Sequence, residues 1–184
     1  MHAPPPRPAT PDELDDDTLA FVRRVFQHAR TGEAGELAIL LGQGLPPNLR
    51  NERGDSLLML ACYHGHAAAA RVLLDAGADP ELLNDAGQTP LAAAAFKGDA
   101  ACASLLLASG ARVDNAGPNG KTALMIAAMF NRVDIARLLL EHGADPLALD
   151  ASGMPIRAAA AKMGAEDAVA LLDGLPSGAG AGTR

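Results

Sequence analysis

Apolar residues recur along this chain in short blocks that end in glycine. Three blocks carry nearly the same order of side chains: RVLLDAGADP at 71–80, SLLLASGARV at 104–113 and RLLLEHGADP at 137–146. Each block begins 33 residues after the one before it. A run of leucine that is followed by glycine favours a helix and then its end. A fixed period of this length indicates structural repeats that stack on one another.

Glycines follow the same period in three separate series. The series are Gly54, Gly87, Gly120 and Gly153; Gly44, Gly77, Gly110 and Gly143; and Gly32, Gly65, Gly98 and Gly164, with Asn131 at the missing step of the third. Glycine and asparagine adopt the left-handed conformation at a helix end most readily. The third series therefore predicts the end of one helix in each repeat, and the second series predicts the end of another.

The period divides the chain into five units. The clearest units are 51–83, 84–116 and 117–149, preceded by a degenerate copy at about 18–50 and followed by a partial copy from 150 to about 176. In the unit 84–116, Thr89 and Pro90 are suited to begin a short helix, because a hydroxyl caps free amides and proline fits the first turn. Ser56 and Thr122 stand at the same step as Thr89. The expected fold is an all-α solenoid of helix-turn-helix units with short connecting turns or hairpins.

Several fixed positions of these units repeat in phase. They lie in GDSLLMLAC at 54–62, GQTPLAAAA at 87–95 and GKTALMIAA at 120–128. On these residues the chain resembles the ankyrin-repeat family, whose pattern G-x-T-P-L-x-x-A precedes G-H and then L-L-x-x-G-A-D. The chain departs from the family where a histidine usually follows the leucine, since it has Met59, Ala92 and Met125 there. The hydrogen bonds of that histidine between repeats are therefore not expected, although the fold is.

The end units have polar substitutions that suit the ends of a stack. PDELDDD at 11–17 sets carboxylates ahead of the first helix, where they oppose its dipole favourably. Arg157 stands where the inner units have Leu58, Leu91 and Leu124. We expect the repeat domain at 12–176, between a Pro-rich tail at 1–11 and a Gly-rich tail at 177–184 that are both disordered.

Composition and charge narrow the function classes. The chain is 49% hydrophobic but only 3% aromatic, and its net charge is −7 without a long basic run. This argues against nucleic acid as a partner. No apolar segment at the start resembles a signal peptide, and none is long enough to cross a bilayer, so the expected location is the cytoplasm, without membrane contact.

The stretch ACYHGHAAAA at 61–70 is the strongest candidate for metal or catalytic chemistry. A zinc site needs three or four converging ligands. We expect His64 and His66 on different faces of an ending helix, and Cys62 and Cys102 as buried thiols. Ser56 reads as a helix cap, and no catalytic motif is present. The sequence therefore predicts no metal, no cofactor and no enzymatic activity.

The resemblance implies which residues face a partner. They are the second, third and fifth residues of each unit and the two residues before the glycine that ends the first helix. The expected partner-binding residues are Glu52, Arg53, Asp55, Tyr63, His64, Asp85, Gln88, Phe96, Lys97, Asn119, Lys121, Met129, Phe130, Lys162 and Met163.

Three of the five aromatic residues, Tyr63, Phe96 and Phe130, fall in these positions, and Met129 and Met163 continue the stripe. Such side chains are common anchors in interfaces. The alternative is that the rings only pack against neighbouring units. The expected function is that of a monomeric, non-enzymatic module that binds another protein through a concave face. Two alternatives stay open, a dedicated accessory protein, stabiliser or antitoxin-like inhibitor of one enzyme, and an effector secreted into a host.

Overall fold

The computed structural model describes residues 15–175, and the tails that the sequence predicts at 1–11 and 177–184 lie outside this range. Within it the chain forms ten helices: α1 (Asp16–Thr31), α2 (Ala34–Gly42), α3 (Leu57–His64), α4 (Ala67–Asp75), α5 (Pro90–Lys97), α6 (Ala100–Ala108), α7 (Ala123–Met129), α8 (Val133–Glu141), α9 (Ile156–Lys162) and α10 (Glu166–Asp173). The only extended pairings in this part of the chain are two isolated bridges, Arg50 with Ser56 and Leu149 with Pro155. The predicted all-α repeat fold is confirmed.

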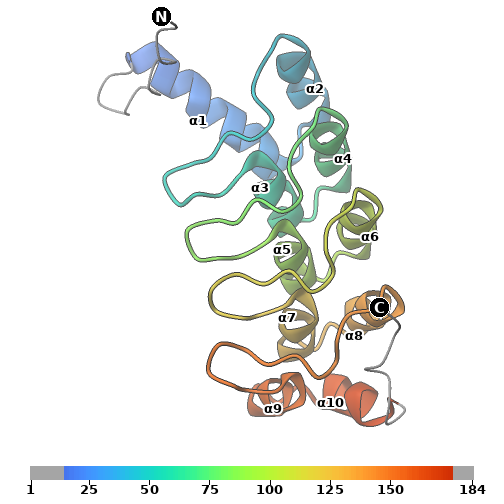
Figure 1. Cartoon of the computed structure of the whole chain (residues 1–184). Coiled ribbons are helices and arrows are strands. Elements are labelled where there is room, and N and C mark those ends of the chain that lie inside the picture. Colours follow the sequence, from blue (N-terminus) through green and yellow to red (C-terminus); the bar gives the residue numbers. More distant parts are fainter. Residues whose placement is uncertain (1–14, 176–184) are drawn as a thin grey trace, which may run out of the picture.

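The helices form five pairs that stack along one axis. The first helices, α1, α3, α5, α7 and α9, make one row, and the second helices make another row beside it (Figure 1). Long loops join each pair to the next and project on the side of the first helices. In Figure 1 the second helices follow the outer side of a gentle curve, and the loops and first helices follow its inner side.

The helix boundaries have the local causes that the sequence predicts. The hydroxyls of Ser56, Thr89 and Thr122 accept hydrogen bonds from the main-chain N–H three residues later, at 3.0, 3.0 and 3.2 Å. At the other end of the first helices, Gly98 has a φ of 84° and Asn131 a φ of 54°. Asparagine is one of the few residues that tolerate this left-handed conformation, so α7 can end without glycine.

The core repeats with the sequence. Leu58, Leu91 and Leu124 are buried at one step of the first helices, and Leu73, Leu106 and Leu139 are buried at one step of the second helices. Met59, Ala92 and Met125, which replace the family's histidine, are buried as well. Apolar packing thus fills the position between the repeats where a histidine hydrogen bond is usual.

The end pairs differ from the inner pairs. Helix α1 has 16 residues, about twice the length of the other first helices, and the Asp15 carboxylate caps it by accepting a hydrogen bond from the N–H of Thr18. Arg157 on α9 is exposed and forms an ion pair with Asp173 on α10. The last unit, which the sequence shows as a partial copy, contains both helices of a pair.

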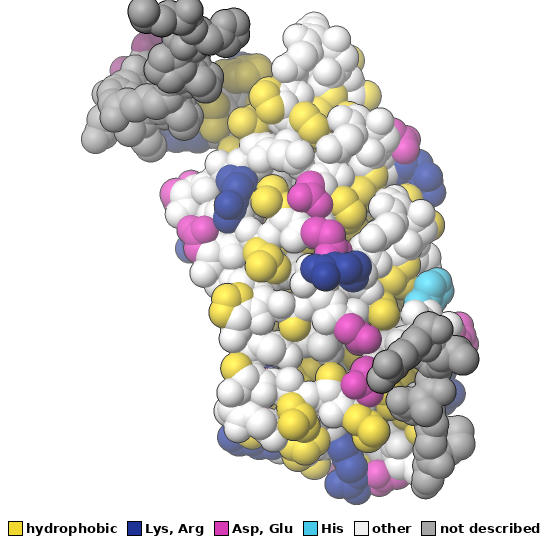
Figure 2. All heavy atoms as spheres, viewed as in Figure 1, with side chains coloured by type: hydrophobic (Ala, Val, Ile, Leu, Met, Phe, Trp, Pro, Cys, Tyr) yellow, Lys and Arg dark blue, Asp and Glu magenta, His cyan; other side chains and the backbone are white. Residues whose placement is uncertain are grey.

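The surface is chemically mixed. Figure 2 shows apolar side chains scattered over one face, with acidic and basic side chains next to one another near the middle of the stack. Among the helices of residues 15–175, none combines the length and the apolar character that a bilayer crossing requires.

Candidate functional site

Three aromatic rings from three successive units form one continuous row. The ring centroids of Tyr63 and Phe96 are 5.4 Å apart and the planes are within 11° of parallel. The centroids of Phe96 and Phe130 are 4.6 Å apart, and these rings meet edge to face at 81°. Both arrangements are favourable for aromatic pairs. We call Tyr63, Phe96 and Phe130 the aromatic ledge.

The rings of the aromatic ledge pack on one another and still face solvent. Tyr63 is 44% exposed and Phe130 is 37% exposed, while Phe96 between them is half-buried. Met129 is half-buried and Met163, at the last step of the same stripe, is 51% exposed. The ledge therefore combines inter-unit packing with an accessible apolar surface, so the two interpretations of the stripe do not exclude each other.

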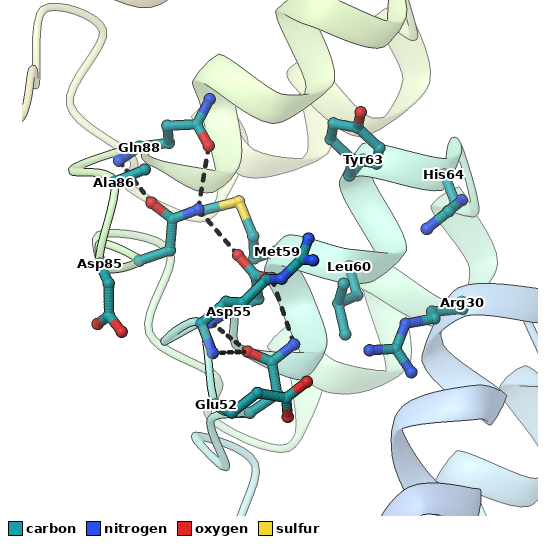
Figure 3. Close-up of a pocket in the computed structure, with 13 residues that line it drawn as sticks. Arg30, Glu52, Asp55, Met59, Leu60, Tyr63, His64, Asp85, Ala86 and Gln88 are labelled. Carbon is teal, nitrogen blue, oxygen red and sulfur yellow. Dashed lines mark hydrogen bonds between the residues drawn. The ribbon is translucent and has the colours of Figure 1, made fainter.

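A groove of about 760 Å³ lies between the projecting loops and the ends of α1 and α3 (Figure 3). Seven of its lining residues are among those that the sequence predicts: Glu52, Arg53, Asp55, Tyr63, His64, Asp85 and Gln88. Six were missed: Arg30, Asn51, Met59, Leu60, Asn84 and Ala86. In Figure 3, Glu52, Asp55 and Asp85 come from the loops, whereas Arg30 and His64 approach from the helix ends on the other side.

The loop side of the groove is held together by asparagine side chains. The Asn51 amide oxygen accepts hydrogen bonds from the N–H groups of Arg53 and Asp55, both at 2.9 Å. The Asn84 side chain donates to the Asp55 carboxylate at 2.8 Å and to the Gln88 side chain at 3.0 Å. These bonds tie the loop of the second unit to that of the third. The repeating asparagines at 51 and 84 were the sequence signal for this role.

Arg30 is the missed residue with the clearest sequence signal. It lies 33 residues before Tyr63 and so occupies the same step in the degenerate first unit. Its side chain is half-buried and reaches the groove from the end of α1 (Figure 3).

The remaining predicted residues lie beyond this groove, along the third, fourth and fifth units. Lys97 and Lys162 are exposed at the ends of α5 and α9. The Asn119 amide oxygen accepts a hydrogen bond from the N–H of Lys121 at 2.9 Å, which orders the tip of the loop between α6 and α7. The residues of the predicted set outside the groove are Phe96, Lys97, Asn119, Lys121, Met129, Phe130, Lys162 and Met163.

The prediction that His64 and His66 lie on different faces is wrong. Their ring centroids are 6.3 Å apart and the planes are within 17° of parallel. Gly65, with a φ of 79°, turns the chain between them and brings both rings to one side. His66 is fixed by a contact of 2.9 Å between its Nε2 and the Arg30 carbonyl oxygen. Burial lowers the pKa of His64, and the nearby His66, Arg30 and Lys97 lower it further.

The two cysteines are buried thiols in the described part of the chain. A hydrogen bond with Cys102 and burial raise the pKa of the Cys62 thiol well above its usual range. A thiol in this state is a poor nucleophile. Within residues 15–175, no three His, Cys, Asp or Glu side chains converge as metal ligands would.

Comparisons with known proteins agree with this architecture. Residues 26–117, half of the chain, match the family described as Ankyrin repeats (3 copies), and residues 119–151 match the family described as Ankyrin repeat. A segment of 62 residues is 61% identical to part of PA3287 of Pseudomonas aeruginosa, whose name describes it as an ankyrin repeat protein. This segment is 34% of the chain and 34% of that relative, so the match spans about a third of the relative's length.

Proposed function

Because this chain belongs to the ankyrin-repeat family, whose repeats are generally non-enzymatic protein-interaction modules, we propose that it binds a partner protein on the inner side of its stack. The binding surface would combine the groove with the aromatic ledge. Both are formed by the loops and first helices, which leaves the second helices free of contact.

The single observation that carries the proposal is the exposure of the aromatic ledge across three units. Aromatic side chains are enriched at interface centres, where they bury a large area and lose little conformational entropy. The ledge is bordered by polar side chains from the groove, among them Arg53, His64 and Gln88. An apolar centre with a polar border is the usual arrangement of a specific protein interface.

The full surface that we propose includes the loop tips and the helix ends of units two to five. Its proposed members are Glu52, Arg53, Asp55, Tyr63, His64, Asp85, Gln88, Phe96, Lys97, Asn119, Lys121, Met129, Phe130, Lys162 and Met163, together with Arg30 of the first unit, which lines the groove. Within it we expect the aromatic residues to contribute most of the affinity.

The test is a double variant, Tyr63→Ala with Phe130→Glu, used for affinity capture from a lysate of the source cell. The expected result is loss of the captured partner while helical content and thermal unfolding stay close to those of the unmodified chain. Arg71→Ala with Arg137→Ala is the matched control, because both arginines are exposed on second helices. Equal capture by all three proteins would overturn the proposal, as would unfolding of the double variant.

A further inference from the structure

Positively charged side chains accompany the aromatic ledge, and the columns of residues to which its rings belong contain no carboxylate. The two residues that precede the glycine or asparagine at the end of each first helix form two columns through the stack. These positions hold Arg30, Thr31, Tyr63, His64, Phe96, Lys97, Met129, Phe130, Lys162 and Met163. The whole chain has 22 acidic and 15 basic residues, so these columns have the opposite sign to the molecule.

Three cations of these columns form no ion pair with any residue that the structure describes. Within residues 15–175, the side chains of Arg30, Lys97 and Lys162 take part in none of the ion pairs, which instead join Arg50 with Asp85, Arg112 with Glu81 and Arg157 with Asp173. Arg132 adds another positive group beside the ledge, because its Nε donates a hydrogen bond to the Phe96 carbonyl oxygen at 3.2 Å.

The nearby carboxylates are engaged or lie on the loop side. Asp99 caps α6 by accepting a hydrogen bond from the N–H of Cys102 at 3.0 Å. Asp55 accepts hydrogen bonds from the side chains of Asn51 and Asn84. Glu52 and Asp85 come from the loops, across the groove from Arg30 (Figure 3). Burial is the main cause of the lowered pKa of His64, and the charges of His66, Arg30 and Lys97 at the helix ends lower it further.

We infer that the ledge binds an extended, acidic segment of the partner, with carboxylates at Arg30 and Lys97 and apolar side chains across Tyr63, Phe96 and Phe130. This inference rests on the proposed function and adds the chemistry of the ligand. Nucleic acid, which also combines negative charge with stacking, fits less well because the chain as a whole carries a net charge of −7.

The repeat geometry sets the spacing of the acidic residues. Packed helices lie roughly 8–10 Å apart, so Arg30 and Lys97, two units apart, are separated by about 16–20 Å. An extended chain rises about 3.3 Å per residue, which gives a spacing of about five or six residues between the carboxylates. Lys97 and Lys162 are also two units apart and require the same spacing.

The test uses a fluorescein-labelled 13-residue peptide with glutamate at both ends and at its centre and leucine, phenylalanine and serine between. A second peptide has lysine in place of the glutamates, and a third probe is a single-stranded oligonucleotide of similar length. Binding to the full chain is measured by fluorescence anisotropy. We expect the glutamate peptide to bind about tenfold more tightly than the lysine peptide, and the difference to shrink with added salt.

Matched variants tie the preference to the ledge. Arg30→Glu with Lys97→Glu is expected to abolish the preference for the glutamate peptide, whereas Arg71→Glu with Arg137→Glu, the same change of charge on second helices, is expected to keep it. Circular dichroism checks that each variant folds.

The inference fails if the lysine peptide or the oligonucleotide binds at least as tightly, or if no probe binds. If the lysine peptide binds the unmodified chain and does not bind the Tyr63→Ala, Phe130→Glu double variant, the charge inference is overturned and the proposed function stays intact. Failure of the proposed function would be recognised by a different result: the double variant would capture the partner as well as the unmodified chain does.

Discussion

Replacing Gly117 with asparagine tests how closely the loops of the stack approach one another. Asn51 and Asn84 occupy the same step in the second and third units, so Gly117→Asn makes the fourth unit more like its neighbours. If a residue shared by several repeats is the most favourable one at its position, this change should raise the free energy of unfolding. The structure predicts a loss, because a Cβ at Gly117 would clash with the main-chain atoms of Gly87 in the preceding loop.

The magnitude follows from three contributions. The contact is with backbone, which cannot rotate away, so the loops must separate at a cost of about 1–3 kcal/mol. The turn gains little in return, because Asn119 already supplies the acceptor for the N–H of Lys121 that Asn84 supplies for Gln88. Replacing glycine lowers the entropy of the unfolded chain and returns about 0.4–1 kcal/mol. The middle values of these two ranges leave a net destabilisation of about 1–2 kcal/mol.

The assay is equilibrium unfolding in urea, followed by far-ultraviolet circular dichroism. With a denaturant slope of about 2 kcal/mol per molar, the midpoint should fall by about 0.5–1 M. Gly35→Asn is the matched control, since Gly35 is exposed, the space around it is open and its backbone is not in the left-handed region. A Gly117→Asn protein as stable as the unmodified chain, or more stable, would refute the close approach of the two loops.

Two further predictions concern the core and the end of the stack. Leu106→Ala removes a fully buried side chain of the central unit and should lower the free energy of unfolding by about 2–5 kcal/mol, measured in the same urea titration; a cost under about 1 kcal/mol would contradict its burial. The Arg157 guanidinium lowers the pKa of Asp173 below its ordinary value of 3.8, so this carboxylate stabilises the fold above that pH and the stabilisation is lost as the pH falls through the lowered pKa. Between about pH 5 and pH 2, the Asp173→Asn protein should therefore lose less stability than the unmodified chain in thermal unfolding scans. Identical pH profiles of the two proteins would contradict the role of this ion pair.

Much of the fold is predictable because the first helices of the inner units, α3, α5 and α7, begin and end at local signals. Ser56, Thr89 and Thr122 cap helices through their own side chains, and Asn131 ends a helix through its own backbone preference. Such signals act within three or four residues and repeat in phase, so the helix boundaries of one unit predict those of the others. The close contact of Gly117 with the preceding loop is different, because it depends on how two units sit against each other.

The candidate site was predictable to the extent that it follows the columns of the repeat. The row of Tyr63, Phe96 and Phe130 is a direct consequence of the 33-residue period. Arg30 was missed because the first unit is degenerate, although its step in the column is the same. The position of His64 beside His66 could not be read from helix periodicity, since the turn at Gly65 interrupts it.

The three rings of the aromatic ledge are supplied by three separate helix pairs, and each pair is held in place only by its neighbours. If one of these pairs opens, the row is broken and its neighbours lose a packing partner. A bound segment that lies across all three rings would therefore hold the three helix pairs together. It should slow the unfolding of the middle of the stack, and removal of the segment should shorten the lifetime of the folded chain.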